Sequence, residues 1–149
     1  MIVYCKDCRR NEKHDNESFT FLSYSFAPSM IKSRYTGKMI LVFSVSISQI
    51  AKTHIRKRIR EVLYHRRSVQ KLEWTAEKLN PKIRGWVNYY TLYSRDKALR
   101  VFCYLNELIR KWISNTYKIR SMPKVYDKYK RIIKAQPALF YHWKLGIVQ

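Results

Sequence analysis

One stretch near the middle of the chain constrains its local fold more than any other: Leu79-Asn80-Pro81-Lys82-Ile83-Arg84-Gly85-Trp86-Val87-Asn88-Tyr89-Tyr90. Asn80 is a typical N-cap residue, and Pro81 suits the first helical position, where its missing N–H needs no partner. Apolar side chains then recur at helical spacing, at Ile83, Trp86, Val87 and Tyr90. The stretch therefore predicts an amphipathic helix that begins at Asn80.

Gly85 is the unusual residue of this predicted helix. Glycine inside a helix costs about 1 kcal/mol relative to alanine. A glycine kept at that cost indicates the close approach of another backbone, a large ring or a nucleic-acid strand. Arg84 and Asn88 are four residues apart and share a different face from the apolar one.

The same stretch resembles the Leu-Asn-Pro-x-Ile/Leu-Arg-Gly-Trp-x-Asn-Tyr-Tyr/Phe signature of the maturase domain in group II intron reverse transcriptases. The residues that carry the resemblance are Leu79, Asn80, Pro81, Arg84, Gly85, Trp86, Asn88, Tyr89 and Tyr90. The alternative interpretation is an amphipathic core helix in another basic helical bundle, one that binds ribosomal RNA or DNA.

The N-terminal residues show the alternation typical of strands. Met1–Tyr4 is a short apolar run, and aromatic residues alternate with small polar ones from Phe19 to Phe26. We expect both segments to be strands, the second ended by Pro28. Residues 32–45 predict a hairpin that turns at Thr36-Gly37.

These N-terminal segments also resemble the end of the palm in the same reverse transcriptases. The matching segments are Ile2-Val3-Tyr4-Cys5-Lys6-Asp7 and Phe19-Thr20-Phe21-Leu22-Ser23-Tyr24-Ser25-Phe26. Ser23 replaces the glycine of the family pattern, in a region that the family uses to hold the primer end.

From about Ile47 the period becomes helical, and five helices are expected. The first helix is indicated by the apolar positions Ala51, Ile55 and Ile59. The second, third and fourth are expected to begin at Ser68, at Asn80-Pro81 and at Ser94, and the fifth to run from Pro123 to Pro137. The predicted fold class is α+β and predominantly α. We expect a β segment over residues 1–45, which resembles the end of the palm, and a helical thumb or maturase domain over 46–149. The closing segment, Phe140–Gly146, resembles the Phe-x-His-Trp ending of that domain, and we expect it to dock on the core.

Charge points to a polyanionic partner. The chain has 31 Lys and Arg against 10 Asp and Glu, a net charge of +21, and the first 30 residues are neutral. The excess therefore lies downstream, where Lys and Arg neutralise phosphates and neighbouring Tyr and Trp stack on unpaired bases. The candidate RNA-binding residues are Lys52, Arg56, Arg60, Arg66, Arg67, Lys82, Arg84, Arg110, Lys111, Lys124, Lys128 and Arg131.

The sequence carries no recognisable catalytic constellation. A polymerase holds two metal ions with closely placed aspartates, and none of the 10 acids forms an Asp-Asp or Asp-x-Asp pair. Cys5-x-x-Cys8 with His14 is half of a zinc-site pattern, but no second Cys or His pair follows at ligand spacing. We therefore expect no catalytic residues, no metal and no cofactor.

The resemblance implies a non-catalytic RNA-binding fragment that helps a group II intron to fold and splice. In the full-length family protein the same region grips an RNA/DNA template–primer duplex. Two alternatives stay open: a remnant without function, and one half of a split RNA-directed DNA polymerase that pairs with a palm and fingers polypeptide. No apolar run approaches the roughly 20 residues of a membrane span, so no membrane partner is expected and the predicted location is the cytoplasm.

Overall fold

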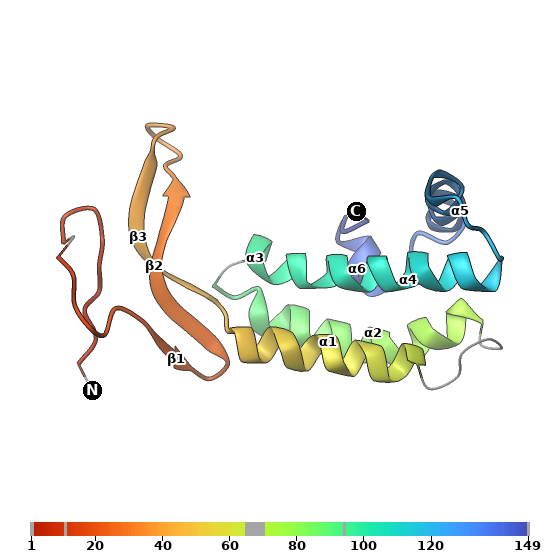
Figure 1. Ribbon diagram of the computed structural model, residues 1–149, viewed down its shortest axis with the longest axis horizontal. Helices are drawn as coiled ribbons and strands as arrows, with labels where there is room; N and C mark the ends of the chain where they lie inside the picture. Colours follow the sequence, from red (N-terminus) through yellow and green to blue (C-terminus); the bar gives the residue numbers. More distant parts are fainter. Residues whose placement is uncertain (1, 11, 65–70, 94, 149) are drawn as a thin grey trace. The chain divides into compact units, whose positions relative to one another are not determined.

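The computed structural model describes residues 2–10, 12–64, 71–93 and 95–148. It divides the chain into two compact units, Met1–Lys52 and Thr53–Gln149 (Figure 1). Three antiparallel strands lie in the first unit, and the helices follow, so the predicted α+β, predominantly α fold class is confirmed. The predicted domain boundary between residues 45 and 46 stays a prediction.

The strands of the first unit are β1 (Phe19–Phe21), β2 (Tyr24–Lys32) and β3 (Met39–Ile47), in the order β1-β2-β3. All neighbours are antiparallel, with Phe19 opposite Phe26 and Pro28 opposite Phe43. The predicted hairpin is confirmed as the β2–β3 connection. Gly37 has φ +68 in its turn, a conformation that glycine adopts without steric cost.

Two expectations about the other strands were wrong. The Phe19–Phe26 segment is two strands, because the chain reverses at Leu22 and Ser23, whose φ angles are 47 and 68. Pro28 lies inside β2 and does not end it. Beyond Phe26, β2 has no β1 residue paired with it, so it is an edge there, where proline is tolerated.

The predicted N-terminal strand was also wrong. Among the described residues before Phe19 there is no strand. Ile2–Tyr4 has no regular secondary structure, and Tyr4 N donates a hydrogen bond to Asn16 O at 2.8 Å. A short apolar run such as this one has a high propensity for a β-strand, but the run alone does not specify a partner strand with which to pair.

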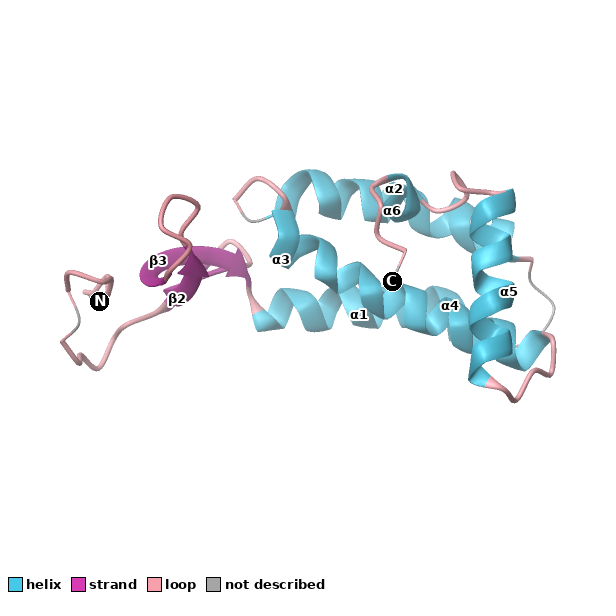
Figure 2. Cartoon of the chain, turned by 90° about the horizontal axis from the view of Figure 1, so that it is seen from above, coloured by secondary structure: helices cyan, strands magenta, loops and turns pink. Residues whose placement is uncertain are grey.

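The helices are α1 (Gln49–Tyr64), α2 (Leu72–Tyr90), α3 (Arg95–Leu99), α4 (Cys103–Thr116), α5 (Met122–Ala135) and α6 (Tyr141–Lys144), with a 3-10 turn, η1, at Arg100–Phe102. In the second unit, α4 packs against α5, and α2 packs against α3 and α6. Figure 2 shows α5 running across α4. No helix in the described part of the chain is both long and apolar enough to span a bilayer.

The core of the second unit is formed by the apolar faces that the periodicity predicts. The largest fully buried apolar side chains come from α1, α2, α4, α5 and the C-terminal segment: Ile55, Ile59, Leu79, Ile83, Leu105, Ile109, Ile113, Val125, Tyr129 and Phe140. Burial of each aliphatic side chain contributes about 1.5–3 kcal/mol relative to exposure. This packing stabilises the helices more than their intrinsic propensity does.

The predicted helix start at Asn80 was wrong, because α2 runs without a break from Leu72 to Tyr90 with Pro81 inside it. Proline in a helix interior costs about 3 kcal/mol. The buried stripe of α2, which continues on both sides of Pro81 as Leu72, Ala76, Leu79, Ile83 and Val87, offsets that cost. The helix expected from Ser94 is instead the succession α3, η1 and α4. Ser68 and Ser94 themselves lie outside the described residues.

Candidate nucleic-acid interface

Ten of the twelve predicted RNA-binding residues are described, and they lie on four helices. The positions are Lys52, Arg56 and Arg60 on α1; Lys82 and Arg84 on α2; Arg110 and Lys111 on α4; and Lys124, Lys128 and Arg131 on α5. Arg66 and Arg67 lie outside the described residues. Six of the ten have exposed side chains: Arg60, Lys82, Arg84, Lys111, Lys124 and Arg131.

Few acids neutralise these cations. Residues 53–149 contain 23 Lys and Arg against six Asp and Glu. Among the described residues of this unit there is one ion pair, between Arg58 and Glu61 at 3.1 Å. Most of the basic side chains are therefore available to an external polyanion.

Helix α5 combines exposed cations with aromatic rings. The Lys128 ammonium lies 4.5 Å from the ring centroid of Tyr117, and that of Lys130 lies 4.5 Å from the ring centroid of Tyr126. Both tyrosine side chains are more than one-third exposed. A cation held beside an exposed ring offers one group for a phosphate and one for a base. Sequence reasoning missed Lys130 and the exposed Lys134 of the same helix.

Two predicted residues are engaged inside the protein. The Arg56 guanidinium lies 5.5 Å from the centroid of the Tyr104 ring, and its Nε is buried with no hydrogen-bond partner among the described residues. The Arg110 guanidinium lies 5.6 Å from the centroid of Tyr129. Both residues therefore join neighbouring helices through cation–π contacts, a role that sequence spacing alone does not reveal.

Gly85 is exposed, and a Cβ placed on it would meet no described protein atom within 4 Å. The expected approach of another backbone or ring from within the protein was therefore wrong for the described residues. The third alternative, a nucleic-acid strand, stays a prediction. Asn88 and Tyr89 of the signature are also exposed, whereas Leu79 is buried in the core.

The side chain of Asn80 connects α2 to the C-terminal segment through two hydrogen bonds. Its Nδ2 donates to Leu139 O at 2.9 Å, and its Oδ1 accepts from Tyr141 N at 2.8 Å. Beside this junction lies a pocket of about 510 Å³, lined by Glu77, Asn80, Pro81 and Arg84 on α2 and by Ala138, Tyr141 and Lys144 after α5. We call it the α2–α6 pocket.

A second asparagine, Asn106 on α4, is a fully buried hub. Its Oδ1 accepts from Trp143 Nε1 at 3.0 Å and lies 2.7 Å from His142 Nε2, and its Nδ2 donates to Ile147 O at 3.0 Å. The indole N–H can only donate, so Asn106 Oδ1 is an acceptor and His142 Nε2 carries a proton.

The other ring nitrogen of His142, Nδ1, is buried and has no hydrogen-bond partner among the described residues, as expected for a neutral ring that is protonated only on Nε2. Burial lowers the pKa of His142 to about 3, because a charged imidazolium loses its hydration there. Burial also raises the pKa of Tyr129 to about 12. The expected docking of the aromatic tail is confirmed, since Phe140, His142 and Trp143 are all buried.

Sequence reasoning missed the pocket residues Glu77, Tyr141 and Lys144 and the hub at Asn106. The pocket joins residues about 60 positions apart, a relation that no local pattern encodes. One signal was present: a polar Asn106 within the apolar pattern of α4 indicates a buried hydrogen-bonding role.

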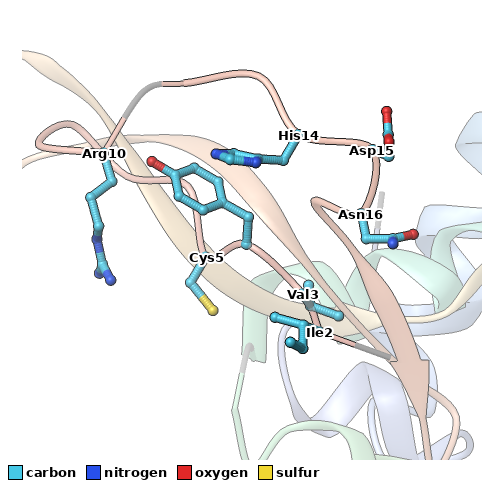
Figure 3. A pocket seen from close by; sticks show the side chains of 8 residues that line it. Ile2, Val3, Cys5, Arg10, His14, Asp15 and Asn16 are labelled. Carbon is cyan, nitrogen blue, oxygen red and sulfur yellow. The ribbon is translucent and has the colours of Figure 1, made fainter.

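The first unit holds Cys5, Cys8 and His14, the half of a zinc-site pattern from which no metal site was expected. The His14 ring lies 3.9 Å from the Tyr4 ring, centroid to centroid, and Figure 3 shows the Cys5 sulfur directed away from His14. Asp7 accepts hydrogen bonds from Arg10 Nη2, Arg10 N and Arg9 N. Together they lower the pKa of the Asp7 carboxyl to about 2, and the bond from the Arg10 side chain has the largest effect. No group of three metal-ligating side chains occurs among the described residues.

The chain matches a known family over most of its helical part. Residues 52–130, more than half of the chain, match the family described as "Group II intron, maturase-specific domain". The matched range contains α2 with its signature and eleven of the twelve predicted RNA-binding residues, and Arg131 lies one residue beyond it. Neither curated proteins nor solved structures gave a match.

Proposed function

The chain belongs to the group II intron maturase-specific domain family, and we propose that it binds group II intron RNA and supports its folding and splicing. The maturase-specific domain is a non-catalytic part of the reverse transcriptase. We accordingly assign the chain a binding role and no reaction of its own. In a full-length protein of the family, the same helices would grip a template–primer duplex.

The observation that carries this proposal is the unneutralised charge of the helical unit Thr53–Gln149. Its helices expose six of the predicted cations, and its described residues form a single ion pair. Without a partner such charge is self-repulsive and weakens the compact state. A folded RNA supplies closely spaced phosphates at which these cations release counterions.

A salt titration tests the electrostatic part of the proposal. Each phosphate contact contributes about −0.7 to −0.9 to the slope of log K against log salt, so six contacts give a slope of roughly −4 to −5 for a labelled intron domain. A slope shallower than about −2 would contradict binding through this surface.

A pair of double variants locates the surface. Lys124→Gln with Arg131→Gln removes two exposed cations of α5, and we expect it to make the slope shallower by about 1.5. Lys32→Gln with Lys38→Gln makes the same charge change on exposed residues of the β2–β3 hairpin. This control should leave the slope nearly unchanged. Equal effects of the two double variants would mean that net charge alone governs binding.

The sheet supports a second candidate function, one half of a split RNA-directed DNA polymerase. The outer edge of β3 carries no paired strand in the described residues, although Cys8 N donates a hydrogen bond to Leu41 O at 3.0 Å. An open edge of this kind accepts a further strand. Co-expression with a palm and fingers polypeptide, followed by a primer-extension assay, tests this candidate. If the two polypeptides form a complex that does not extend the primer, the split-polymerase function is excluded.

A further inference from the structure

The α2–α6 pocket places Arg84, one of the six exposed cations, beside a second cation, a carboxylate and an aromatic ring. Arg84 and Lys144 supply two cations, and neither has a hydrogen bond or ion pair among the described residues. Glu77, on the same helical face as Arg84, supplies a carboxylate that is likewise unengaged. Tyr141 supplies a half-buried aromatic ring.

Pro81 adds an acceptor to this pocket. A residue at position 81 would normally donate its N–H to the carbonyl of residue 77, and proline has no N–H to donate. The Glu77 carbonyl therefore lacks its usual helical partner, in a residue that lines the pocket. The pocket is thus supplied with two cations, an aromatic ring and hydrogen-bond acceptors that the fold leaves unused.

The walls of the pocket are fixed in place. Asn80 makes both of its side-chain hydrogen bonds to the backbone at Leu139 and Tyr141. The following residues, His142 and Trp143, are anchored to Asn106. The two sides of the pocket are therefore held at a set separation before any ligand arrives, which lowers the entropic cost of binding.

We propose that the α2–α6 pocket binds one unpaired nucleotide of the RNA. The cations of Arg84 and Lys144 receive its phosphate, the ring of Tyr141 stacks with its base, and the acceptors at Glu77 receive an exocyclic amine. The inference rests on the proposed function, because the nucleotide belongs to the RNA that the helices bind. Recognition of splayed-out bases by stacking and hydrogen bonds is the usual way in which RNA is read specifically.

The mixed charge of the pocket favours a nucleotide over a free phosphate. A carboxylate beside the two cations repels a bare phosphate, but it accepts hydrogen bonds from the amine of a base. A pocket of about 510 Å³ lies within the range of roughly 300–1,000 Å³ that is typical of small-molecule sites. It therefore has room for a single nucleotide.

The experiment compares two RNA hairpins of identical stem, one with a single bulged 2-aminopurine nucleotide and one without the bulge. Affinities come from fluorescence anisotropy, and 2-aminopurine emission reports stacking of the bulged base. We expect the full chain to bind the bulged hairpin at least tenfold more tightly, with quenched emission.

Two variants on one helix provide the matched test. Arg84→Gln removes a pocket cation, and Lys82→Gln removes an exposed cation of α2 that does not line the pocket. Arg84→Gln should reduce the preference for the bulged hairpin to less than threefold, whereas Lys82→Gln should retain it. Glu77→Leu should raise affinity for the unbulged hairpin, because a negative charge is removed, and yet lower the preference for the bulge. Far-UV circular dichroism verifies that each variant is folded.

Binding of both hairpins by the unmodified chain with equal affinity would overturn the pocket proposal and leave the proposed function intact. Equal loss of the bulge preference in Arg84→Gln and Lys82→Gln would also overturn it. Failure to bind either hairpin or the intron would overturn the proposed function itself, and the pocket proposal with it.

Discussion

Replacement of Asn106 by alanine should destabilise the helical unit more than any other asparagine substitution in its described residues. The variant removes the acceptor of the His142 Nε2–H and Trp143 Nε1–H bonds and the donor to Ile147 O. Both ring donors lie on side chains that are at most 4% exposed. A buried donor left without a partner costs about 1–3 kcal/mol.

Two orphaned donors, together with the small cavity left by the amide, give an expected loss of roughly 3–5 kcal/mol in the free energy of unfolding. Urea denaturation followed by circular dichroism at 222 nm and by tryptophan fluorescence measures this loss. Asn88→Ala is the matched control, because Asn88 is exposed on α2 and its side chain forms no hydrogen bond among the described residues. It should change the free energy by no more than about 0.5 kcal/mol.

Asn80→Ala tests the second attachment of the C-terminal segment. It removes two half-buried hydrogen bonds, and we expect an intermediate loss of about 1–2 kcal/mol. A single hydrogen bond contributes about 1 kcal/mol to stability. If Asn106→Ala lowers the free energy of unfolding by no more than about 1 kcal/mol beyond the loss caused by Asn88→Ala, the central hydrogen-bonding role of Asn106 is refuted.

Three further predictions concern single residues. The pKa of His142 is about 3 in the folded chain and ordinarily about 6.5, so below pH 6.5 the unfolded chain alone binds this proton. The free energy of unfolding should therefore fall by up to about 1.4 kcal/mol per pH unit towards pH 3, whereas constant stability in urea titrations from pH 6.5 to 5 would contradict this. Ser23→Gly relieves a φ of 68 and should stabilise the β1–β2 turn by about 1 kcal/mol in thermal melts, where no gain would argue against strain. Gly85→Ala should stabilise α2 by about 1 kcal/mol, since the new Cβ meets no described atom within 4 Å. If a nucleic-acid strand approaches Gly85, the added methyl group should also lower RNA affinity. Unchanged affinity would exclude that approach.

Local patterns were sufficient for much of this fold. The spacing of Ala51, Ile55 and Ile59 correctly identified the buried face of α1. The Thr36-Gly37 turn correctly identified the β2–β3 hairpin. In each of these cases the periodicity of the segment agrees with the packing around it.

The errors occurred where tertiary contacts override local preference. Asn80 and Pro81 are typical of a helix start, but α2 continues through them because its apolar stripe packs on both sides and Asn80 is engaged by residues 139 and 141. Pro28 is typical of a strand end, but the edge position within β2 makes it harmless. The α2–α6 pocket was beyond prediction, because residues 77–84 meet residues 138–144 only in the folded chain.

Charge and shape recognition can be separated in one measurement. The affinity of the chain for a folded group II intron should be compared with that for a shuffled RNA of equal length, at physiological salt. Recognition of intron shape predicts at least tenfold tighter binding of the intron, a difference of about 1.4 kcal/mol. Equal affinities with equally steep salt dependence would mean that the positive charge alone governs binding, and would contradict the maturase function proposed for this chain.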